Sequence, residues 1–307
     1  MNQTSYKIAA LVLAYSRFEM LQQLIAALRT QTRLPDEIIV IYQGSREDIA
    51  TWLMQQSDLT VLRQGNKGSA GGFCTGIEES LKRGHAWTWV FDDDGVPQPS
   101  ALEELVRSPY FSPATSVFLA SRVVDRHGKT YMSPAAADAN RWYATVLQDK
   151  CVEVTSACWL GLLVNSEAVR KFGLPIAEFF LFEEDLEFTS RLSRNGTAYC
   201  AIDSVIVHYQ DATFDPFGKD FVKYAYFTRN HVARAKVEPG AVPIRVVRAL
   251  RRAAYFLSLV ATRKAPFRTV PWILRGLFLF WPRIRYPRLA AQVNPGSPAS
   301  KAPTKNA

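Results

Sequence analysis

Short apolar runs alternate with segments of helical periodicity in the first half of the chain, and this alternation constrains the fold more than any other feature. Ile8–Leu13, Glu37–Tyr42, Leu59–Leu62 and Ala86–Phe91 have the composition of buried strands. Helical patterns lie between them. An alternation of this kind predicts an α/β fold, in which a mostly parallel sheet carries helices on both faces.

Local signals place the remaining elements. Ser16 and Glu19 fit a capping box before a helix at 18–28, and Pro35 follows that helix. The middle of the chain is less regular, and beyond Asp215 the pattern becomes helical. We expect further helices near 49–56, 76–83, 166–172, 184–194, 245–261 and 271–280, and further strands at 117–121, 151–155, 159–165 and 201–209.

The 307 residues divide into three predicted parts. Residues 1–215 carry the strand–helix alternation and form the predicted catalytic domain. Residues 216–290 form a helical, basic region. Residues 291–307 are mostly Pro, Ala, Ser, Asn and Lys, which predicts a disordered tail.

Charge is distributed unevenly along the chain. From Pro239 to the end there are 13 Lys and Arg residues and no Asp or Glu. The preceding residues carry 24 basic and 28 acidic side chains, a net charge of −4. A segregated positive charge indicates an anionic partner, either nucleic acid or a lipid surface.

The chain lacks the signals of export and of membrane insertion. No cleavable signal peptide precedes the first strand, and no run reaches the roughly 18 apolar residues of a spanning helix. The four cysteines are scattered without a Cys-x-x-Cys pair, which fits a reducing compartment. We therefore expect a cytoplasmic protein.

Three aspartates, Asp92, Asp93 and Asp94, follow the fourth apolar run directly. Ligands of open α/β sheets bind at the carboxyl ends of strands, where these residues should lie. Their mutual repulsion is tolerable if Mg²⁺ or Mn²⁺ neutralises it, and such a metal could bind a diphosphate. A solvated acidic turn is the alternative, but the position after a buried strand favours the functional interpretation.

Other segments contain possible ligand-binding or catalytic residues, and each of them also has a purely structural explanation. The glycine-rich segment from Asn66 through Gly71 and Gly72 could bind an anion at a helix N-terminus, or form a plain turn. Glu184 and Asp185 could include a general base, or could interact with the helix dipole. His208 could be a metal ligand or a structural residue, and Trp159 could stack on a sugar ring or lie in the core.

Taken together, these segments resemble glycosyltransferase family 2, and within it the galactofuranosyltransferases and related rhamnosyltransferases of cell-surface polysaccharide assembly. The resemblance covers roughly residues 6–285. The matching segments, in order, are 66–76, 87–99, 158–165, 181–192, 205–209 and 224–230.

This resemblance implies a GT-A fold and a role for each matched residue. Asp92 and Asp94 would handle the metal and the donor diphosphate and ribose, with His208 completing the metal site and Asp93 beside the donor. Asp185 would be the catalytic base, with Glu184 as its neighbour. Asn66, Gly71, Gly72 and Trp159 would contact the donor.

The end of the second strand departs from the family pattern. Many relatives have an acidic residue there that binds the nucleobase, whereas this chain has Gln43 and Gly44. We retain Gln43 as a donor-binding candidate. The resemblance implies inversion by a single displacement, with UDP-galactofuranose as the favoured donor, dTDP-rhamnose as the alternative, and a lipid-linked glycan as the acceptor.

The basic region 241–290 interleaves arginines with aromatic and aliphatic residues. This pattern predicts an anchor that lies in the plane of an anionic membrane surface and keeps the protein peripheral on its cytoplasmic side. Helices packed on the catalytic domain are the alternative. The acidic body disfavours a nucleic-acid-binding protein. A nucleotidyltransferase would have a basic, phosphate-activating loop near its N-terminus, and residues 15–17 match such a loop poorly. The presence of Asp185 disfavours a non-catalytic module that only binds a nucleotide-sugar.

Overall fold

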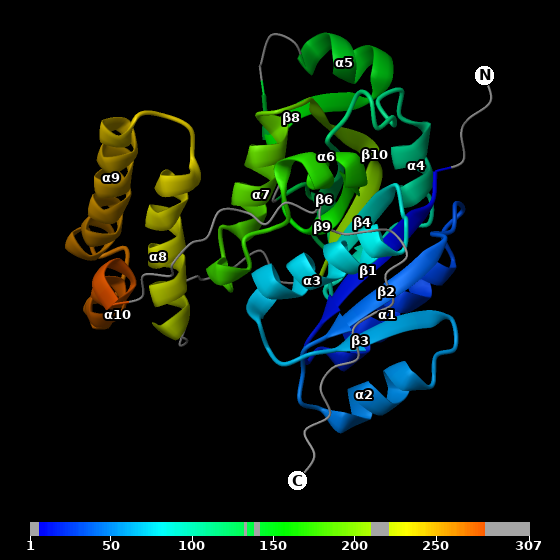
Figure 1. The fold of residues 1–307 in the computed structure, drawn as a ribbon, viewed down its shortest axis with the longest axis horizontal. Helices are drawn as coiled ribbons and strands as arrows, with labels where there is room; N and C mark the ends of the chain where they lie inside the picture. The colour runs from blue at the N-terminus through cyan, green and yellow to red at the C-terminus, as the bar shows by residue number, and fades with distance from the viewer. Residues whose placement is uncertain (1–5, 132–133, 138–141, 210–220, 280–307) are drawn as a thin grey trace.

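The computed structural model describes residues 6–131, 134–137, 142–209 and 221–279, and its centre is a ten-stranded sheet (Figure 1). The strands are β1 (Ile8–Ala14), β2 (Glu37–Tyr42), β3 (Leu59–Arg63), β4 (Trp87–Asp92), β5 (Gly95–Pro97), β6 (Phe118–Val124), β7 (Ala135–Ala136), β8 (Cys151–Ser156), β9 (Leu160–Asn165) and β10 (Ala198–His208). Their order across the sheet is β3-β2-β1-β4-β9-β6-β10-β8-β7, and β5 pairs with β10.

The sheet is parallel in its first half and mixed in its second. β3, β2, β1 and β4 are parallel neighbours, as the strand–helix alternation predicts. β9 then runs antiparallel between β4 and β6, and β8 runs antiparallel to β10. Beyond β4 the expectation of a mostly parallel sheet holds only for β6 and β10, which are parallel neighbours. The alternation that supports it ends there, and antiparallel neighbours need no crossover helix.

Helices cover both faces of the sheet, as predicted. They are α1 (Phe18–Arg29), α2 (Glu47–Met54), α3 (Gly68–Lys82), α4 (Ala101–Arg107), α5 (Trp142–Asp149), α6 (Ser166–Phe172) and α7 (Glu184–Ser193). Because successive strand side chains point to opposite faces, β1 contributes to two cores. Its residues Ile8, Ala10 and Val12 lie in the core of α1, α2 and α4, and its alternate residues lie in the core of α3, α6 and α7.

Two helix N-termini differ from the expectations. α1 begins after Arg17, and no side chain caps it by a hydrogen bond, so the capping box of Ser16 and Glu19 is not formed. The backbone N–H of Tyr15 instead donates to Asp93, which fixes this loop from β4. α3 begins at Gly68 rather than near Gly76, so the glycine-rich segment belongs largely to the helix.

The C-terminal helices form a group beside the sheet, as Figure 1 shows. They are α8 (Phe221–Val237), α9 (Val242–Ala261), a 3₁₀ turn (Phe267–Thr269), α10 (Val270–Leu274) and a π-helical turn (Arg275–Leu279). Tyr224 and Val232 of α8 pack with Phe256 and Leu259 of α9 and with Ile273 of α10.

α8 also packs on the sheet-containing body, where its Ala233 meets Ala70, Ile176 and Phe179. The described helices agree with the predicted helical region, while the predicted tail at 291–307 lies outside the described residues. Among the helices described, none combines the length and hydropathy needed to cross a membrane.

Candidate active site

A cavity of about 530 Å³ opens where β1, β2 and β4 end. Parallel strands meet at such an edge, so residues that follow different strands are brought together there. The cavity also reaches the segment before α7 and the start of α8. Its lining residues are Leu13, Tyr15, Ser16, Arg17, Gln43, Asn66, Gly68, Ser69, Asp92, Asp93, Phe180, Leu181, Lys223 and Tyr226.

Arg17 neutralises part of the aspartate cluster. Its Nη1 atom lies 2.7 Å from Oδ1 of Asp93 and 2.9 Å from Oδ2 of Asp94. Both carboxylates are buried, whereas Asp92 ends β4 and faces the cavity. The cluster is therefore an ion-paired structure at a strand end, and the alternative of a solvated acidic turn is wrong.

The three carboxyl groups differ in acidity because their surroundings differ. Burial, followed by the charges of Asp94 and Asp93, raises the pKa of Asp92 well above its ordinary value. Burial also raises the pKa of Asp93, although Arg17 opposes this effect. Burial acts in the same direction on Asp94, but the hydrogen bond and charge of His208, together with Arg17, outweigh it and leave the pKa of Asp94 lowered.

His208, at the end of β10, contacts Asp94 of this cluster. β5 pairs with β10 so that His208 is opposite Gly95, and the His208 Nε2 atom lies 3.2 Å from Oδ2 of Asp94. The Nδ1 atom of His208 bonds to the hydroxyl of Tyr131, whose ring stacks on the imidazole. A second partner on the far nitrogen is how metal-binding histidines are usually oriented.

The Asp94–His208 pair therefore offers one carboxylate and one oriented imidazole, which fit part of a divalent cation's coordination sphere. Within the described parts of the chain, no three His, Cys, Asp or Glu side chains are arranged to hold a metal. A bound substrate or water could supply further ligands.

Gln43 and Asn66 shape the loop that begins α3. The Gln43 side chain donates to Gly68 O at 3.0 Å and accepts from the Lys67 N–H at 2.9 Å. The Oδ1 atom of Asn66 accepts from the Gly68 N–H at 2.8 Å, and the Ala70 N–H donates to Phe180 O. These amides are already paired within the protein, so the expectation of bare amides waiting for an anion is wrong for residues 67, 68 and 70.

The glycines of this segment have different roles. Gly68 has φ +69°, and a Cβ atom on it would lie 1.9 Å from Phe180 O, so only glycine fits. Gly71 and Gly72 lie inside α3 and do not line the cavity. A Cβ atom on Gly72 would lie 2.4 Å from Leu13 Cδ1, which shows that this glycine lets α3 approach β1.

Glu184 and Asp185 begin α7, behind the cavity wall. Glu184 is buried, and its Oε1 atom accepts a hydrogen bond from the cavity-lining Ser69. Burial, and then the charge of Asp185, raises the pKa of Glu184 to about 8. Burial raises the pKa of Asp185 to about 6, although the N–H of Leu186, which donates to Oδ1 at 2.7 Å, opposes the shift. At neutral pH this pair therefore holds one proton and one negative charge.

Trp159 lies in the core beside this pair rather than in the cavity wall. It is 2% exposed and stacks on Phe73, with ring centroids 4.5 Å apart. Within the described residues, its Nε1 atom and the Oε2 atom of Glu184 are buried without a hydrogen bond of normal geometry. The indole N–H is nevertheless close enough to lower the pKa of Glu184 slightly against burial.

The structure thus brings Gln43, Asn66, Asp92 and Asp93 to one cavity and leaves Gly71, Gly72 and Trp159 outside its wall. Sequence reasoning missed several wall residues. Arg17 follows the end of β1, so its place after a predicted strand was an available signal. Ser69, Leu181 and Tyr226 lie within segments that carry the family resemblance, whereas no local signal marks Phe180 and Lys223.

Residues 10–171 match the profile of the family described as Glycosyl transferase family 2. The chain is 24% identical over 319 residues to galactofuranosyltransferase GlfT1 of Mycobacterium tuberculosis (strain H37Rv), which covers 96% of this chain and 99% of the relative. It is 25% identical over 207 residues to GlfT1 of Mycolicibacterium smegmatis, which covers 62% of this chain and 67% of the relative.

Solved structures share the fold at low sequence identity. GalNAc-T7, crystallised with UDP, GalNAc and Mn²⁺, superposes with a TM-score of 0.58 at 10% identity and covers 80% of this chain. TarS of S. aureus superposes with a TM-score of 0.59 at 12% identity and covers 89%. This chain spans 55% and 48% of those two chains, respectively. The predicted GT-A type α/β fold is confirmed.

Proposed function

Because this chain belongs to glycosyl transferase family 2, we propose that it transfers a sugar from a nucleotide-sugar to a glycan acceptor with inversion of configuration. One observation supports this most strongly. A half-buried, mostly ionised carboxylate, Asp185, lies next to the protonated carboxyl group of Glu184, just behind a cavity lined by Asp92 and Asp93. A base and a polar donor pocket are what a single displacement requires.

In the proposed reaction, an acceptor hydroxyl attacks the anomeric carbon from the face opposite the nucleotide diphosphate. The new C–O bond forms as the bond to the diphosphate breaks, and Asp185 takes the hydroxyl proton. Glu184 stays protonated and accepts a hydrogen bond from Ser69. It therefore adds no second negative charge beside the base. Arg17 places a cation in the cavity wall, where it suits the diphosphate.

A divalent cation, Mn²⁺ or Mg²⁺, fits this proposal, with Asp94 and His208 as the protein groups that would hold it. When bound, such an ion would neutralise negative charge on the departing nucleotide diphosphate. Tyr131 holds the His208 imidazole so that its Nε2 atom faces Asp94. The Mn²⁺ of the GalNAc-T7 structure supports this part of the proposal by analogy of fold.

We propose UDP-galactofuranose as the donor, since the similar curated proteins are named galactofuranosyltransferases. Gln43 follows β2 and Asn66 precedes α3, and both line the cavity. We propose that they contact the nucleoside. A lipid-linked glycan is the proposed acceptor.

The proposed membrane contact is the exposed surface of the C-terminal helices. Part of the predicted apolar set is buried, because Phe256, Leu259 and Ile273 form the core of the helical group. Other apolar residues of these helices are exposed, beside arginines such as Arg251. An apolar surface with basic residues suits an anionic headgroup region. These exposed residues are Val242, Ile244, Val246, Val247, Leu250, Tyr255, Leu257, Phe267, Leu274 and Phe278.

The direct test is transfer and thermal stabilisation with a panel of nucleotide-sugars, with Mn²⁺, with Mg²⁺ and with a chelator. We expect UDP-galactofuranose with a metal to raise the melting temperature and to be consumed, and the chelator to stop turnover. If dTDP-rhamnose alone is consumed, the donor assignment is wrong. If no donor is consumed with any lipid-linked acceptor, the proposed function fails.

A further inference from the structure

The segment that leads into α7 has an unusual backbone. Phe180, Phe182 and Glu183 have φ values of 63°, 69° and 68°, in the left-handed region that non-glycine residues rarely adopt. Each such residue costs on the order of 1 kcal/mol or more, and persists only where surrounding contacts fix it. Glu183 is also the residue that immediately precedes α7, two positions before Asp185.

Asn230 of α8 fixes the carbonyl groups of this segment. Its Nδ2 atom lies 2.8, 2.7 and 2.9 Å from the carbonyl oxygens of Phe179, Leu181 and Phe182. The neighbouring Arg229 donates from Nη2 to Phe179 O at 2.6 Å, and from Nε to Oδ1 of Asn230. Both side chains are buried, so these bonds are shielded from water.

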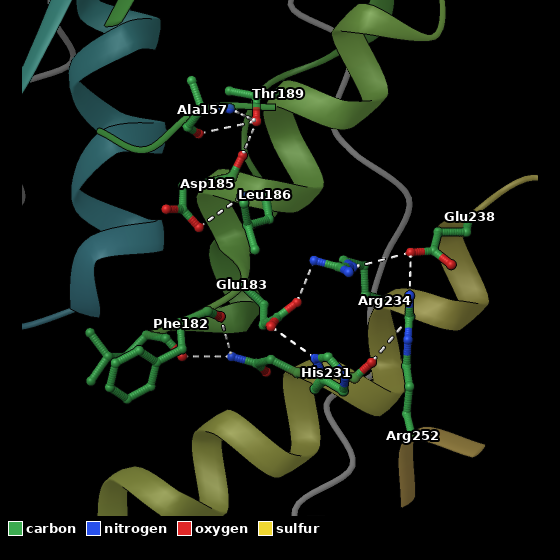
Figure 2. A network of polar contacts seen from close by, with 12 residues as sticks. Ala157, Phe182, Glu183, Asp185, Leu186, Thr189, His231, Arg234, Glu238 and Arg252 are labelled. Atoms are coloured by element: carbon green, nitrogen blue, oxygen red, sulfur yellow. Dashed lines mark hydrogen bonds and ion pairs between the residues drawn. The ribbon is translucent and has the colours of Figure 1, made fainter. Parts of the chain in front are cut away.

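His231 and Arg234, on the same helix, hold the Glu183 side chain. Figure 2 shows both pointing toward its carboxylate. The Nδ1 atom of His231 lies 2.9 Å from Oε1 and the Nη1 atom of Arg234 lies 2.5 Å from Oε2. Glu183 is 7% exposed, and His231 and Arg234 lower its pKa in spite of its burial. The carboxylate is therefore ionised and paired, which fixes the turn before α7 from its side-chain end.

The far side of Arg234 is tied to α9. Its Nε atom lies 3.1 Å from Oε1 of Glu238, which also accepts from Arg252 at 2.7 Å. Within the described residues, the Glu238 carboxylate pairs with Arg234, Arg248 and Arg252 and not with the segment before α7, so this half of the network joins α8 to α9 (Figure 2). The two halves of the network share Arg234, and Arg252 also donates to the His231 carbonyl oxygen at 3.2 Å.

We infer that Asn230, His231 and Arg234 are positioning residues for the base Asp185. They hold residues 179–183 in a backbone conformation that the sequence alone would not maintain, and the orientation of the first turn of α7 follows from it. This inference rests on the proposed function. It also gives a structural role to Asn230 in the segment 224–230, which carries part of the family resemblance and has no role in the proposed chemistry.

Arg234→Gln tests the inference, with Arg234→Lys as the conservative variant and Glu238→Gln as the matched control. Displacing a reacting group by about 1 Å costs up to about 100-fold in rate, so we expect kcat of Arg234→Gln to fall roughly 10- to 100-fold. Since the donor pocket keeps Gln43, Asn66 and Arg17, the Kd for UDP should stay within about threefold. Arg234→Lys should keep most of kcat, because its ammonium can still pair with Glu183.

Glu238→Gln breaks the other half of the network. It should lower the melting temperature about as much as Arg234→Gln does, but leave kcat near that of the wild type. Asn230→Ala should reproduce the loss of kcat if it folds. The inference is overturned if Arg234→Gln retains full kcat, or if Glu238→Gln loses as much as Arg234→Gln. A wild-type chain without transfer activity would refute the proposed function instead, and an Asp185→Asn variant that keeps turnover would show that Asp185 is not the base.

Discussion

At the scale of single residues, the site depends on carboxyl groups whose acidity is set by burial. Asp185 and Glu184 are adjacent, yet their pKa values are raised to about 6 and about 8, mainly by burial. Asp185 is therefore available as a base at neutral pH, while Glu184 stays protonated. This division of labour between neighbouring carboxyls needs no difference in residue type, since environment alone separates their pKa values.

Asp185→Asn should lower kcat roughly 10²- to 10⁴-fold, the usual share of general-base catalysis, with UDP binding nearly unchanged. Because the base must be ionised, wild-type kcat should fall as the pH drops through about 6. Steady-state rates across pH, with calorimetry for UDP, measure both effects. A variant that loses UDP affinity but keeps turnover would assign Asp185 to binding and make Glu184 the candidate base.

Glu184→Gln should stabilise the fold in the absence of metal. The folded-state pKa of Glu184 is raised, so between its ordinary value of 4.5 and about 8 the folded chain binds more protons than the unfolded chain and loses stability as the pH rises. Glutamine removes this loss, and we expect a gain of roughly 1–3 kcal/mol at pH 8 and little at pH 5. Urea unfolding at both pH values tests the prediction, and an equal effect at both would contradict it.

At the scale of elements, the site is a junction of helix ends at one edge of the sheet. α3 and α7 meet through Ser69, Glu184 and the Phe180 carbonyl, and α8 holds the segment between them. The junction is tight because the turn at Gly68 leaves no room for a side chain. The glycines that suggested an anion-binding loop therefore allow close packing, of Gly68 against Phe180 and of α3 against β1 at Gly72.

Gly68→Ala should destabilise the protein by more than roughly 2 kcal/mol, because it adds both a strained φ and a clash with Phe180 O. Gly65→Ala is the matched control, since a Cβ atom there meets nothing within 4 Å. Urea unfolding and UDP binding should change for the first variant only. Equal stability of the two variants would show that the turn can move.

At the scale of the whole molecule, an acidic catalytic body is joined to a basic helical group through α8. α8 buries one side against α9 and α10 and the other against the body. Removing the chain from Pro239 onward would expose the inner side of α8, including Tyr224 and Val232, and would disturb the clamp on residues 179–183. Point changes on the outer surface therefore test membrane contact more cleanly than truncation.

Val247→Ser combined with Leu250→Ser should weaken binding to vesicles rich in phosphatidylglycerol by about tenfold, because it removes exposed apolar area from α9. Met54→Ser, at a position 66% exposed on α2, is the control. Cosedimentation at physiological salt measures the effect, with duplex DNA as a competitor. Unchanged binding of the double variant, or preference of the wild type for DNA, would contradict the membrane proposal.

The sequence by itself determined most of the elements, though not β5, β7, α4 or α5, and it located the candidate site residues at strand and helix ends. Apolar runs, their periodicity and the residues that follow them are local properties, so Asp92 at the end of β4, Asp185 at the start of α7 and His208 at the end of β10 were placed correctly from the chain alone. The parallel half of the sheet followed from the same pattern.

Only the tertiary structure decided how these pieces meet. Arg17 pairs with Asp93 across 76 residues, Ser69 bonds to Glu184 across 115, and Asn230 reaches Phe182 across 48. The strand β9 was predicted from the sequence, but its position between β4 and β6 is known only from the tertiary structure. Such contacts depend on which surfaces are buried together, and burial also sets the pKa values on which the proposed chemistry rests. No local pattern specifies either one, because both arise from groups that the chain brings together only when it folds.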